Sequence, residues 1–161
     1  MALFMKFLAL VLSCLVCTFA VAQQPTPKPP FGVPAGAKLF NGKWYHVFLE
    51  EMDWSRAKAK CAAAGGQLVV IPDSATWDFV KTLTNAMVWL GATDEKVQGE
   101  WVWVDGTKMT FTAWGKGQPD NKSGEEDYLA TWKSKWNDAR KNTRSNKAFP
   151  VVGYICEWKA K

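Results

Sequence analysis

Apolar residues follow two arrangements along the chain, one typical of helices and one typical of strands. A first helix is expected after Asp53, which suits an N-cap position, and it is expected to end at Gly65-Gly66. Four apolar residues at helical spacing form its predicted inward face: Trp54, Ala57, Cys61 and Ala64. A second helix is expected after Asp73 or Ser74. Its predicted inward face carries Trp77, Val80 and Leu83.

Short apolar stretches separated by polar connections predict strands. Two of them lie near the helices, at residues 44–48 and 67–71. Four more follow the second helix, at residues 88–90, 101–103, 128–132 and 151–158. Since the helices come first and most of the strands come later, the pattern predicts an α+β domain. The connections at 91–99 and 115–127 are long for so small a domain, and long loops of this kind are usually functional or disordered.

The N-terminal residues are interpreted as an export signal. Residues 1–22 carry one charge, Lys6, then an apolar run and the small-residue ending Ala20-Val21-Ala22. We therefore expect cleavage after this ending and a secreted, extracellular protein without a membrane span. A membrane anchor is the alternative, because the run is nearly long enough to cross a bilayer. Residues 23–37 contain five prolines and predict an extended linker, so the folded domain is expected at 38–161.

Composition favours a folded domain and divides the cysteines into two pairs. The chain has 161 residues, of which 48% are hydrophobic and 14% aromatic, so disorder is not expected for most of it. Cys14 and Cys17 lie in the signal. Cys61 and Cys156 remain, and an exported protein can keep them as a disulfide. Removal of Lys6, the only charge in the signal, lowers the formal net charge from +5 to +4.

Cations gather near the C-terminus. The segment 133–147 contains a single acid, Asp138, and six basic residues: Lys133, Lys135, Arg140, Lys141, Arg144 and Lys147. Two interpretations stay open. The segment is either a solvated basic surface or a surface that attracts anionic glycans or phosphate-bearing partners. Nucleic acid is not expected as a partner of an exported protein.

Side chains with oxygen donors gather between residues 118 and 138. They are Gln118, Asp120, Asn121, Glu125, Glu126, Asp127, Asn137 and Asp138. Carboxylate and amide oxygens suit a hard cation such as Ca²⁺, which takes about six to eight oxygen ligands. Zn²⁺ and copper prefer nitrogen or sulfur ligands. Acidic loops are also commonly just solvated, so composition alone leaves metal binding open.

The order of five short motifs resembles the C-type lectin family. The motifs are Trp89-Leu90-Gly91, Gln118-Pro119-Asp120, Glu126-Asp127, Trp136-Asn137-Asp138 and Gly153-Tyr154-Ile155-Cys156-Glu157. The resemblance extends from about Trp44 to Trp158. It implies the C-type lectin-like fold, an α+β fold with two helices, short antiparallel strands and long Ca²⁺-binding loops. It also implies a disulfide between Cys61 and Cys156.

The resemblance further implies one Ca²⁺ site that also binds sugar. Its ligands would be Gln118, Asp120, Glu126, Asn137 and Asp138, and the peptide bond before Pro119 would be cis. Two adjacent sugar hydroxyls would replace water on the ion, while the same side chains hydrogen-bond to those hydroxyls. Gln118 together with Asp120 is the family's galactose-type arrangement. A galactose-type carbohydrate is therefore the expected partner.

Three departures from the family's pattern change these expectations. Residues 121–127 contain no aromatic side chain to stack on a galactose-type sugar. Tyr128 and Lys141 stand at the two positions of the family's inner disulfide. An auxiliary metal site would use Asp94, Asn121 and Asp127. Gln98 and Asn121, however, stand where carboxylates are often found, and fewer charges would lower the affinity of that site.

An enzyme is not expected. His46 is the only His, and no nucleophile motif accompanies it to complete a triad. Two functions stay open: Ca²⁺-dependent carbohydrate binding, or a lectin-like domain that binds protein, lipid or anionic polysaccharide without Ca²⁺-mediated sugar coordination. The sequence Asn121-Lys122-Ser123 also matches the N-glycosylation sequon. A glycan there would crowd the predicted site.

Overall fold

The structure, a computed structural model, describes residues 28–142 and 150–160. The predicted signal at 1–22, with Cys14 and Cys17, lies outside the described residues, as do Arg144 and Lys147 of the basic segment. The described part forms two α-helices, a short 3₁₀ helix and eight strands. In chain order they are β1 (Lys38–Phe40), β2 (Lys43–Phe48), α1 (Trp54–Ala63), β3 (Gln67–Leu68), α2 (Ser74–Val80), β4 (Val88–Thr93), β5 (Val102–Trp103), the 3₁₀ helix (Lys122–Gly124), β6 (Tyr128–Trp132), β7 (Lys135–Ala139) and β8 (Gly153–Lys159).

Both helices begin where the sequence predicts. The Asp53 side chain accepts a hydrogen bond from the backbone N–H of Arg56 at 2.8 Å, and the Asp73 side chain accepts one from the N–H of Thr76 at 2.7 Å. Helix α1 ends before Gly65, which takes the left-handed conformation with φ +74°. Helix α2 ends at Val80, so the predicted inward residue Leu83 lies beyond the helix and packs on the core from a turn. Among the described residues, neither helix is long and apolar enough to cross a membrane.

Two strand predictions needed correction. The predicted first strand, at 44–48, is the second strand of the sheet, because β1 precedes it and pairs with it as a hairpin. The turn between them contains Asn41-Gly42, both with positive φ, which is a strong hairpin signal that the hydrophobic pattern alone does not contain. The predicted strand at 67–71 is regular only over β3. Residues 69–71 continue as buried, irregular backbone.

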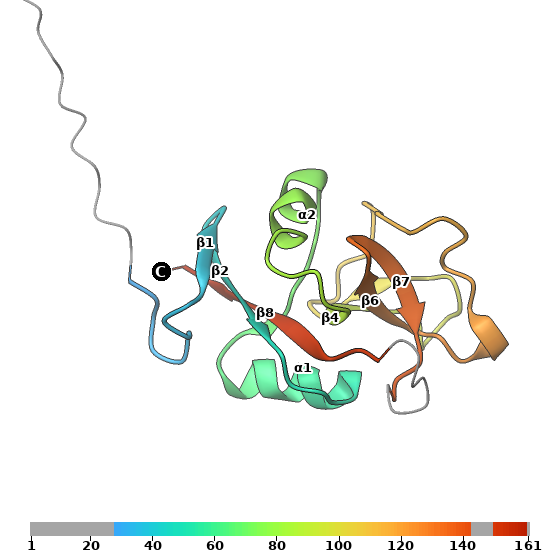
Figure 1. The fold of residues 1–161 in the computed structure, drawn as a ribbon, viewed down its shortest axis with the longest axis horizontal. Coiled ribbons are helices and arrows are strands. Elements are labelled where there is room, and N and C mark those ends of the chain that lie inside the picture. Colours follow the sequence, from blue (N-terminus) through green and yellow to red (C-terminus); the bar gives the residue numbers. More distant parts are fainter. Residues whose placement is uncertain (1–27, 143–149, 161) are drawn as a thin grey trace, which may run out of the picture.

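The eight strands form one sheet in the order β1-β2-β8-β4-β6-β7, with β3 paired to β8 and β5 to β4. The C-terminal strand β8 lies between the N-terminal hairpin and β4, so the two ends of the domain are side by side (Figure 1). Strands β4 and β8 are parallel, and the other pairs are antiparallel. In the order of pairing, β6 and β7 come last, at the opposite edge from β1.

The sheet separates two apolar clusters because alternate residues of a strand point to opposite faces. In β8, Tyr154, Cys156 and Trp158 belong to the cluster that includes helix α1, while Ile155 belongs to the cluster that includes helix α2. In β4, Trp89 lies in the first cluster and Leu90 in the second. The helices lie on opposite sides of β8 in Figure 1. The fold prediction of an α+β domain is therefore confirmed, with a helix on each face.

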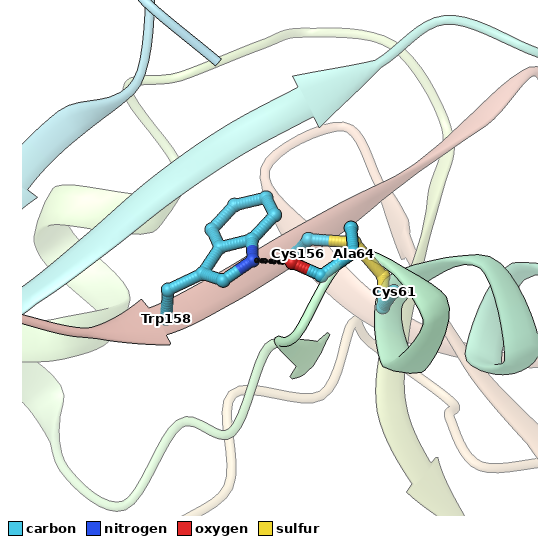
Figure 2. The surroundings of a disulfide bond; sticks show 4 residues. All are labelled: Cys61, Ala64, Cys156 and Trp158. Carbon is cyan, nitrogen blue, oxygen red and sulfur yellow. Dashed lines mark hydrogen bonds between the residues drawn. A yellow bond between two sulfur atoms is a disulfide. The ribbon is translucent and has the colours of Figure 1, made fainter. Parts of the chain in front are cut away.

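A disulfide joins the end of α1 to β8, as predicted. Cys61 and Cys156 are bonded across 95 residues of chain, with a Cα–Cα distance of 5.6 Å. Figure 2 shows that the indole N–H of Trp158 donates to the carbonyl oxygen of Ala64 in the same region, at 2.9 Å. The covalent link and the hydrogen bond together fix the C-terminus of the helix against the last strand.

The predicted extended linker is partly wrong for the described residues 28–37. Two turns form there, closed by hydrogen bonds from Val33 N–H to the Pro30 carbonyl at 3.0 Å and from Ala37 N–H to the Pro34 carbonyl at 2.9 Å. Val33 and Ala37 pack against the core on the α1 side. Proline favours these turns by fixing φ, and the small apolar residues between the prolines supply the packing that proline content alone did not suggest.

Candidate functional site

The oxygen-rich residues lie on the 115–127 segment, here called the binding loop, and on β7 beside it. In Figure 1 the binding loop, in orange, runs beside β6 and β7. Its first residues pair with β7, because the N–H of Gly115 donates to the Trp136 carbonyl at 2.8 Å. The N–H of Trp136 donates in turn to the Ala113 carbonyl at 2.9 Å. The loop is thus held at the edge of the sheet from its first residue.

A tryptophan on β7 anchors this edge. The Trp136 side chain is fully buried and makes edge-to-face contacts with four aromatic rings at centroid distances of 5.7–5.8 Å: Trp77, Trp103, Phe111 and Trp114. Such pairs stabilise by about 0.5–1.5 kcal/mol each beyond the area that they bury. Because Asn137 and Asp138 follow directly on the same strand, this packing fixes where the next two side chains lie.

Three predicted ligands come together. One carboxylate oxygen each from Asp120, Glu126 and Asp138 lie within 4.8 Å of one another. Asp120 and Glu126 come from the binding loop and Asp138 from β7. Asp120 is exposed, Glu126 is half-buried and Asp138 is fully buried, so the cluster opens toward solvent on the Asp120 side.

The buried carboxylate of Asp138 also holds the binding loop. Its Oδ1 accepts a hydrogen bond from the backbone N–H of Asp120 at 3.2 Å, and its Oδ2 accepts one from the N–H of Asn121 at 2.6 Å. The peptide bond between Gln118 and Pro119 is cis, as the resemblance implied. The same side chain that would bind a metal thus also positions the backbone that carries a second ligand.

The two amide ligands predicted from the resemblance lie beside this cluster. The Gln118 Oε1 atom accepts a hydrogen bond from the N–H of Asp120 at 3.2 Å. The Asn137 side-chain amide donates to the backbone carbonyl of Asp138. Both amides therefore contact the backbone of a cluster member. The structure brings the three acids together directly and places the two amides next to them.

The pKa values of the acids reflect this crowding. Burial raises the pKa of Asp138 above its ordinary value, and the charge of Asp120 raises it further, although three backbone hydrogen bonds act in the opposite direction. Burial also raises the pKa of Glu126, as do the charges of Asp138 and Asp120. Burial and mutual repulsion thus disfavour the charged forms of these carboxylates in the metal-free protein. A bound cation would stabilise the charged forms.

The cluster fits a Ca²⁺ ion. Oxygen ligands lie about 2.3–2.6 Å from Ca²⁺, so two ligands of one ion are at most about 5 Å apart. The separations within the cluster satisfy this limit. All three donors are carboxylate oxygens, and Cys and His are absent from the group, which matches the preference of a hard cation.

The auxiliary residues form a hydrogen-bonded group of their own. Asp94 is buried, its N–H donates to the Asp127 carbonyl at 3.1 Å, and its Oδ2 accepts from the side chain of Gln98 at 2.8 Å. Gln98 accepts in turn from the side chain of Asn121 at 2.5 Å. In the sequence, Gln98 and Asn121 stand where carboxylates are often found, and Asn121 was also expected as a ligand of the auxiliary metal site. Their complementary amide groups were the available signal that they bond to each other.

The basic segment is less free than its sequence suggests. Arg140 pairs with Glu125 at 3.3 Å and Lys141 lies 3.7 Å from a carboxylate oxygen of Glu95, so acids from distant parts of the chain balance two of the cations. Asp138 is the single acid within the segment itself, and these two ion pairs come from acids outside it, which the sequence alone does not place nearby. Lys133 and Lys135 are exposed at the β6–β7 turn.

Comparisons with known proteins agree with one another. The family model described as Lectin C-type domain matches residues 50–157. The chain is similar to a hepatic lectin of Gallus gallus, with 40% identity over 114 residues, which are 65% of this chain and 55% of that protein. This match therefore spans about half of the length of that relative. A perlucin-like protein of Mytilus galloprovincialis is 30% identical over 86% of this chain and 90% of its own length. The galactose-specific lectin nattectin of Thalassophryne nattereri is 30% identical over 66% of this chain and 70% of its own length.

Solved structures show the same fold. The cow C-type carbohydrate-recognition domain of CD23, solved in the presence of a GlcNAc2Man3 oligosaccharide, superposes with a TM-score of 0.71 at 25% identity and covers 80% of this chain and 96% of that one. The carbohydrate-recognition domain of the mouse scavenger receptor C-type lectin gives 0.70 at 30% identity, covering 80% and 97%. A calcium-independent type II antifreeze protein gives 0.68 at 26% identity, covering 80% and 95%.

Proposed function

The chain belongs to the family of C-type lectin domains, whose members are non-enzymatic binding proteins, and from this premise we propose that it binds carbohydrate through a Ca²⁺ ion. The proposed ligands are Gln118, Asp120, Glu126, Asn137 and Asp138. The observation that carries the proposal is the convergence of three carboxylate oxygens within 4.8 Å at a solvent-facing edge of the sheet.

The residues of the site have complementary roles toward a sugar. When bound, Ca²⁺ supplies coordination positions for two neighbouring sugar hydroxyls. The carboxylates of Asp120 and Glu126 accept hydrogen bonds from hydroxyl protons. The side-chain NH₂ groups of Gln118 and Asn137 donate to hydroxyl oxygens; that of Asn137 must first leave the Asp138 carbonyl, whereas Gln118 is engaged only through its Oε1 atom. Asp138 is a proposed ligand and, being buried, it also orients the loop by accepting two backbone N–H groups.

The proposed ligand class is galactose-type. In the tripeptide Gln118-Pro119-Asp120, the amide comes first and the carboxylate second, which favours an equatorial 3-hydroxyl beside an axial 4-hydroxyl. The similarity to a galactose-specific lectin supports this choice. Residues 121–127 contain no aromatic side chain, so the contribution of ring stacking from this segment is missing, and we expect weak affinity for a single sugar. Trp114, which lies before the tripeptide, packs against Trp101 and Trp136 instead.

A glycan array tests whether binding depends on Ca²⁺. The protein is applied in about 5 mM CaCl₂, a concentration above a millimolar dissociation constant, and again in excess EDTA. Glu125→Gln is the matched control, since Glu125 is an exposed acid next to Glu126 and pairs with Arg140 instead. The proposal expects binding that EDTA abolishes in both the wild type and the control, and that Glu126→Gln abolishes even in Ca²⁺. Sugar binding that survives chelation contradicts it.

A double substitution tests how the sugar is chosen. Gln118→Glu with Asp120→Asn exchanges the positions of amide and carboxylate and leaves the number of non-hydrogen atoms in each side chain unchanged. If the loop distinguishes hydroxyl geometry, preference moves from galactose-type toward mannose-type ligands. Retained galactose preference would mean that other residues determine the specificity.

Secretion is part of the proposal and rests on the N-terminal sequence. Residues 1–22 combine one Lys, an apolar run and the ending Ala20-Val21-Ala22. The Cys61–Cys156 disulfide suits an oxidising compartment. Mass spectrometry of the protein recovered from the culture medium should give an N-terminus at Gln23. A cell-associated chain that retains residues 1–22 would contradict secretion and favour a membrane anchor.

A second candidate function is binding of an anionic surface without Ca²⁺. The similarity to a calcium-independent antifreeze protein favours a lectin-like domain that has no need of the ion. The exposed Lys133 and Lys135 offer a cationic patch at the β6–β7 turn. Binding of sulfated or uronic-acid glycans in EDTA, lost on raising the salt and on Lys133→Ala with Lys135→Ala, would support this candidate over the first.

A further inference from the structure

One exposed glutamine links the binding loop to a buried anchor. Gln98 lies in the 94–99 turn that follows β4. Its Nε2 atom donates to Oδ2 of Asp94 at 2.8 Å, and its Oε1 atom accepts from Nδ2 of Asn121 at 2.5 Å. We call this chain of contacts, Asp94 to Gln98 to Asn121, the amide bridge.

The anchor of the amide bridge is rigid. Asp94 is only 2% exposed, and the same Oδ2 atom also accepts the backbone N–H of Gly99 at 2.8 Å. The N–H of Asp94 donates to the carbonyl of Asp127, just before β6. The Asp94 carboxylate is therefore fixed relative to the sheet and does not move with the binding loop. A side chain that is hydrogen-bonded to it is fixed in the same way.

The other end of the amide bridge reaches the metal ligands. The Oδ1 atom of Asn121 accepts the backbone N–H of Glu126 at 3.1 Å, and the N–H of Asn121 donates to Asp138 at 2.6 Å. Asn121 itself has φ +40°, a left-handed conformation that few side chains other than Asn and Gly adopt readily. Asn121 thus ties together both sides of the cluster, and Gln98 fixes the Asn121 side chain.

The two ends of Gln98 require an amide. Toward Asp94 the side chain must donate to a carboxylate, and toward Asn121 it must accept from an amide. A glutamate offers only acceptors at neutral pH, and a methionine of the same length offers no comparable donor or acceptor. The bridge is therefore specific to the residue at position 98, although that residue is exposed and its hydrogen bonds go to Asp94 and Asn121 and not to the three clustered acids.

We infer that Gln98 is a positioning residue, which keeps the binding loop in its ligand-holding conformation in the absence of metal and takes the place that an auxiliary ion would need. The inference rests on the proposed Ca²⁺ site. It adds two points. The loop is preformed by hydrogen bonds, and the chain binds one Ca²⁺ ion because an NH₂ group stands where a second ion would need an oxygen. Replacement of Gln98 should weaken Ca²⁺ binding without unfolding the domain, since Gln98 is exposed and lies outside the apolar core.

Three variants of the full chain test the inference. Gln98→Met preserves length and removes both hydrogen bonds. Gln98→Glu removes the donor and places a carboxylate beside Asp94, whose Oδ1 atom has no hydrogen-bond partner among the described residues. Lys96→Ala is the control, because Lys96 is exposed in the same turn and its side chain makes no hydrogen bond within the described residues. Calorimetric titration with CaCl₂ alone gives the dissociation constant and the number of ions for each.

The expected result is one ion for the wild type and a dissociation constant about 10-fold higher for Gln98→Met, as is usual when a residue that supports a metal ligand is removed. Lys96→Ala should match the wild type, and Gln98→Glu should bind two ions. An unchanged constant for Gln98→Met would overturn the positioning role, and two ions on the wild type would overturn the claim that Gln98 takes the place of an auxiliary ion. A single ion on Gln98→Glu would overturn the claim that the amide excludes an auxiliary ion.

Amide hydrogen exchange in EDTA separates this inference from the proposed function. In the metal-free chain, the N–H groups of Asn121 and Glu126 should exchange at least several-fold faster in Gln98→Met than in Lys96→Ala. If the wild type binds no Ca²⁺, the proposed function fails, yet this exchange difference still supports the bridge. Equal exchange in the two variants overturns the bridge whether or not Ca²⁺ binds.

Discussion

Neutralising one carboxylate of the site should strengthen the metal-free fold while it destroys metal binding. Glu126→Gln keeps the size of the side chain and an oxygen that can accept from the N–H of Lys122, a contact of 3.2 Å in the structure. It removes a negative charge that lies within 4.8 Å of two others, on Asp120 and Asp138. The perturbation therefore isolates charge repulsion from packing.

Coulomb's law gives the scale of the effect. At 4.8 Å, each pair of carboxylates repels by about 0.9 kcal/mol at the dielectric constant of water and by about 3.5 kcal/mol at an effective value of 20. Asp120 is exposed and Glu126, which belongs to both pairs, is only half-buried, so we use the lower limit for both pairs, which gives about 2 kcal/mol of relief. An unfolding entropy of about 2.1 cal/mol/K per residue over about 120 residues converts this to a rise of about 8 °C in Tm, and less in added salt.

Thermal unfolding should be measured in EDTA and in Ca²⁺ between pH 4 and pH 7. Because burial and the neighbouring charges raise the pKa of Glu126, the folded chain binds this proton more tightly than the unfolded chain does. The contribution of Glu126 to the stability of the metal-free wild type is therefore present at low pH and is lost as pH rises through its raised pKa. The advantage of Glu126→Gln should be absent near pH 4 and complete at pH 7.

Calcium should reverse the order of the two proteins. The wild type gains stability by mass action, about 2.7 kcal/mol when Ca²⁺ is at 100 times its dissociation constant, while Glu126→Gln gains little. The matched control Glu125→Gln loses an exposed ion pair with Arg140 and should be slightly less stable than the wild type, with an unchanged response to Ca²⁺. A Glu126→Gln protein that melts below the wild type in EDTA at pH 7 would refute the reasoning, since it would mean that the carboxylates are not in conflict.

Three further outcomes are expected. Cys61→Ala with Cys156→Ala opens a link across 95 residues and should cost about 4–5 kcal/mol in the chain-entropy model, measured by urea unfolding; a loss below about 1 kcal/mol would contradict it. Gly153→Ala would place a Cβ atom 2.2 Å from the carbonyl oxygen of Phe48, and the backbone shift that this forces should cost about 3 kcal/mol or more in thermal unfolding. Glycosylation of Asn121 should lower the Ca²⁺ affinity, because the glycan is attached to the same Nδ2 atom that donates to Gln98; a glycosylated chain with intact Ca²⁺ affinity in mass spectrometry and titration would argue against this.

Sequence reasoning found most of the fold because the fold depends on local signals. Asp53 and Asp73 could be identified as caps since an N-cap needs only a side-chain acceptor two or three residues before the N–H that it satisfies. The β1 strand was missed because its pattern is short and exposed, and it is fixed by pairing with β2. Residues 28–37 were also misjudged, since packing of Val33 on the core depends on contacts far along the chain.

The candidate site was likewise predicted in part from the sequence. The residue types at 118, 120 and 126 on the loop and at 137 and 138 on the strand could be recognised from motif order, but which atoms meet could not. Asp138 shows the difference: its carboxylate both belongs to the acid cluster and accepts two backbone N–H groups from the loop. That double role follows from the fold of two segments about twenty residues apart, which no local pattern encodes.

The departures from the family's pattern share a physical consequence for the site. At the two positions where the resemblance implies the family's inner disulfide, Lys141 lies over the ring of Tyr128, 5.6 Å from its centroid. A cation–π contact at a half-exposed position stabilises by about 0.5–1 kcal/mol, whereas a disulfide that closes a loop of about 15 residues contributes about 3 kcal/mol. The cation–π contact therefore contributes about 2 kcal/mol less to the stability of the domain than a disulfide at these two positions would. Ca²⁺ at 100 times its dissociation constant supplies a similar amount. The ordered conformation of β6, β7 and the binding loop should thus depend on bound Ca²⁺ more strongly than in a relative with both disulfides.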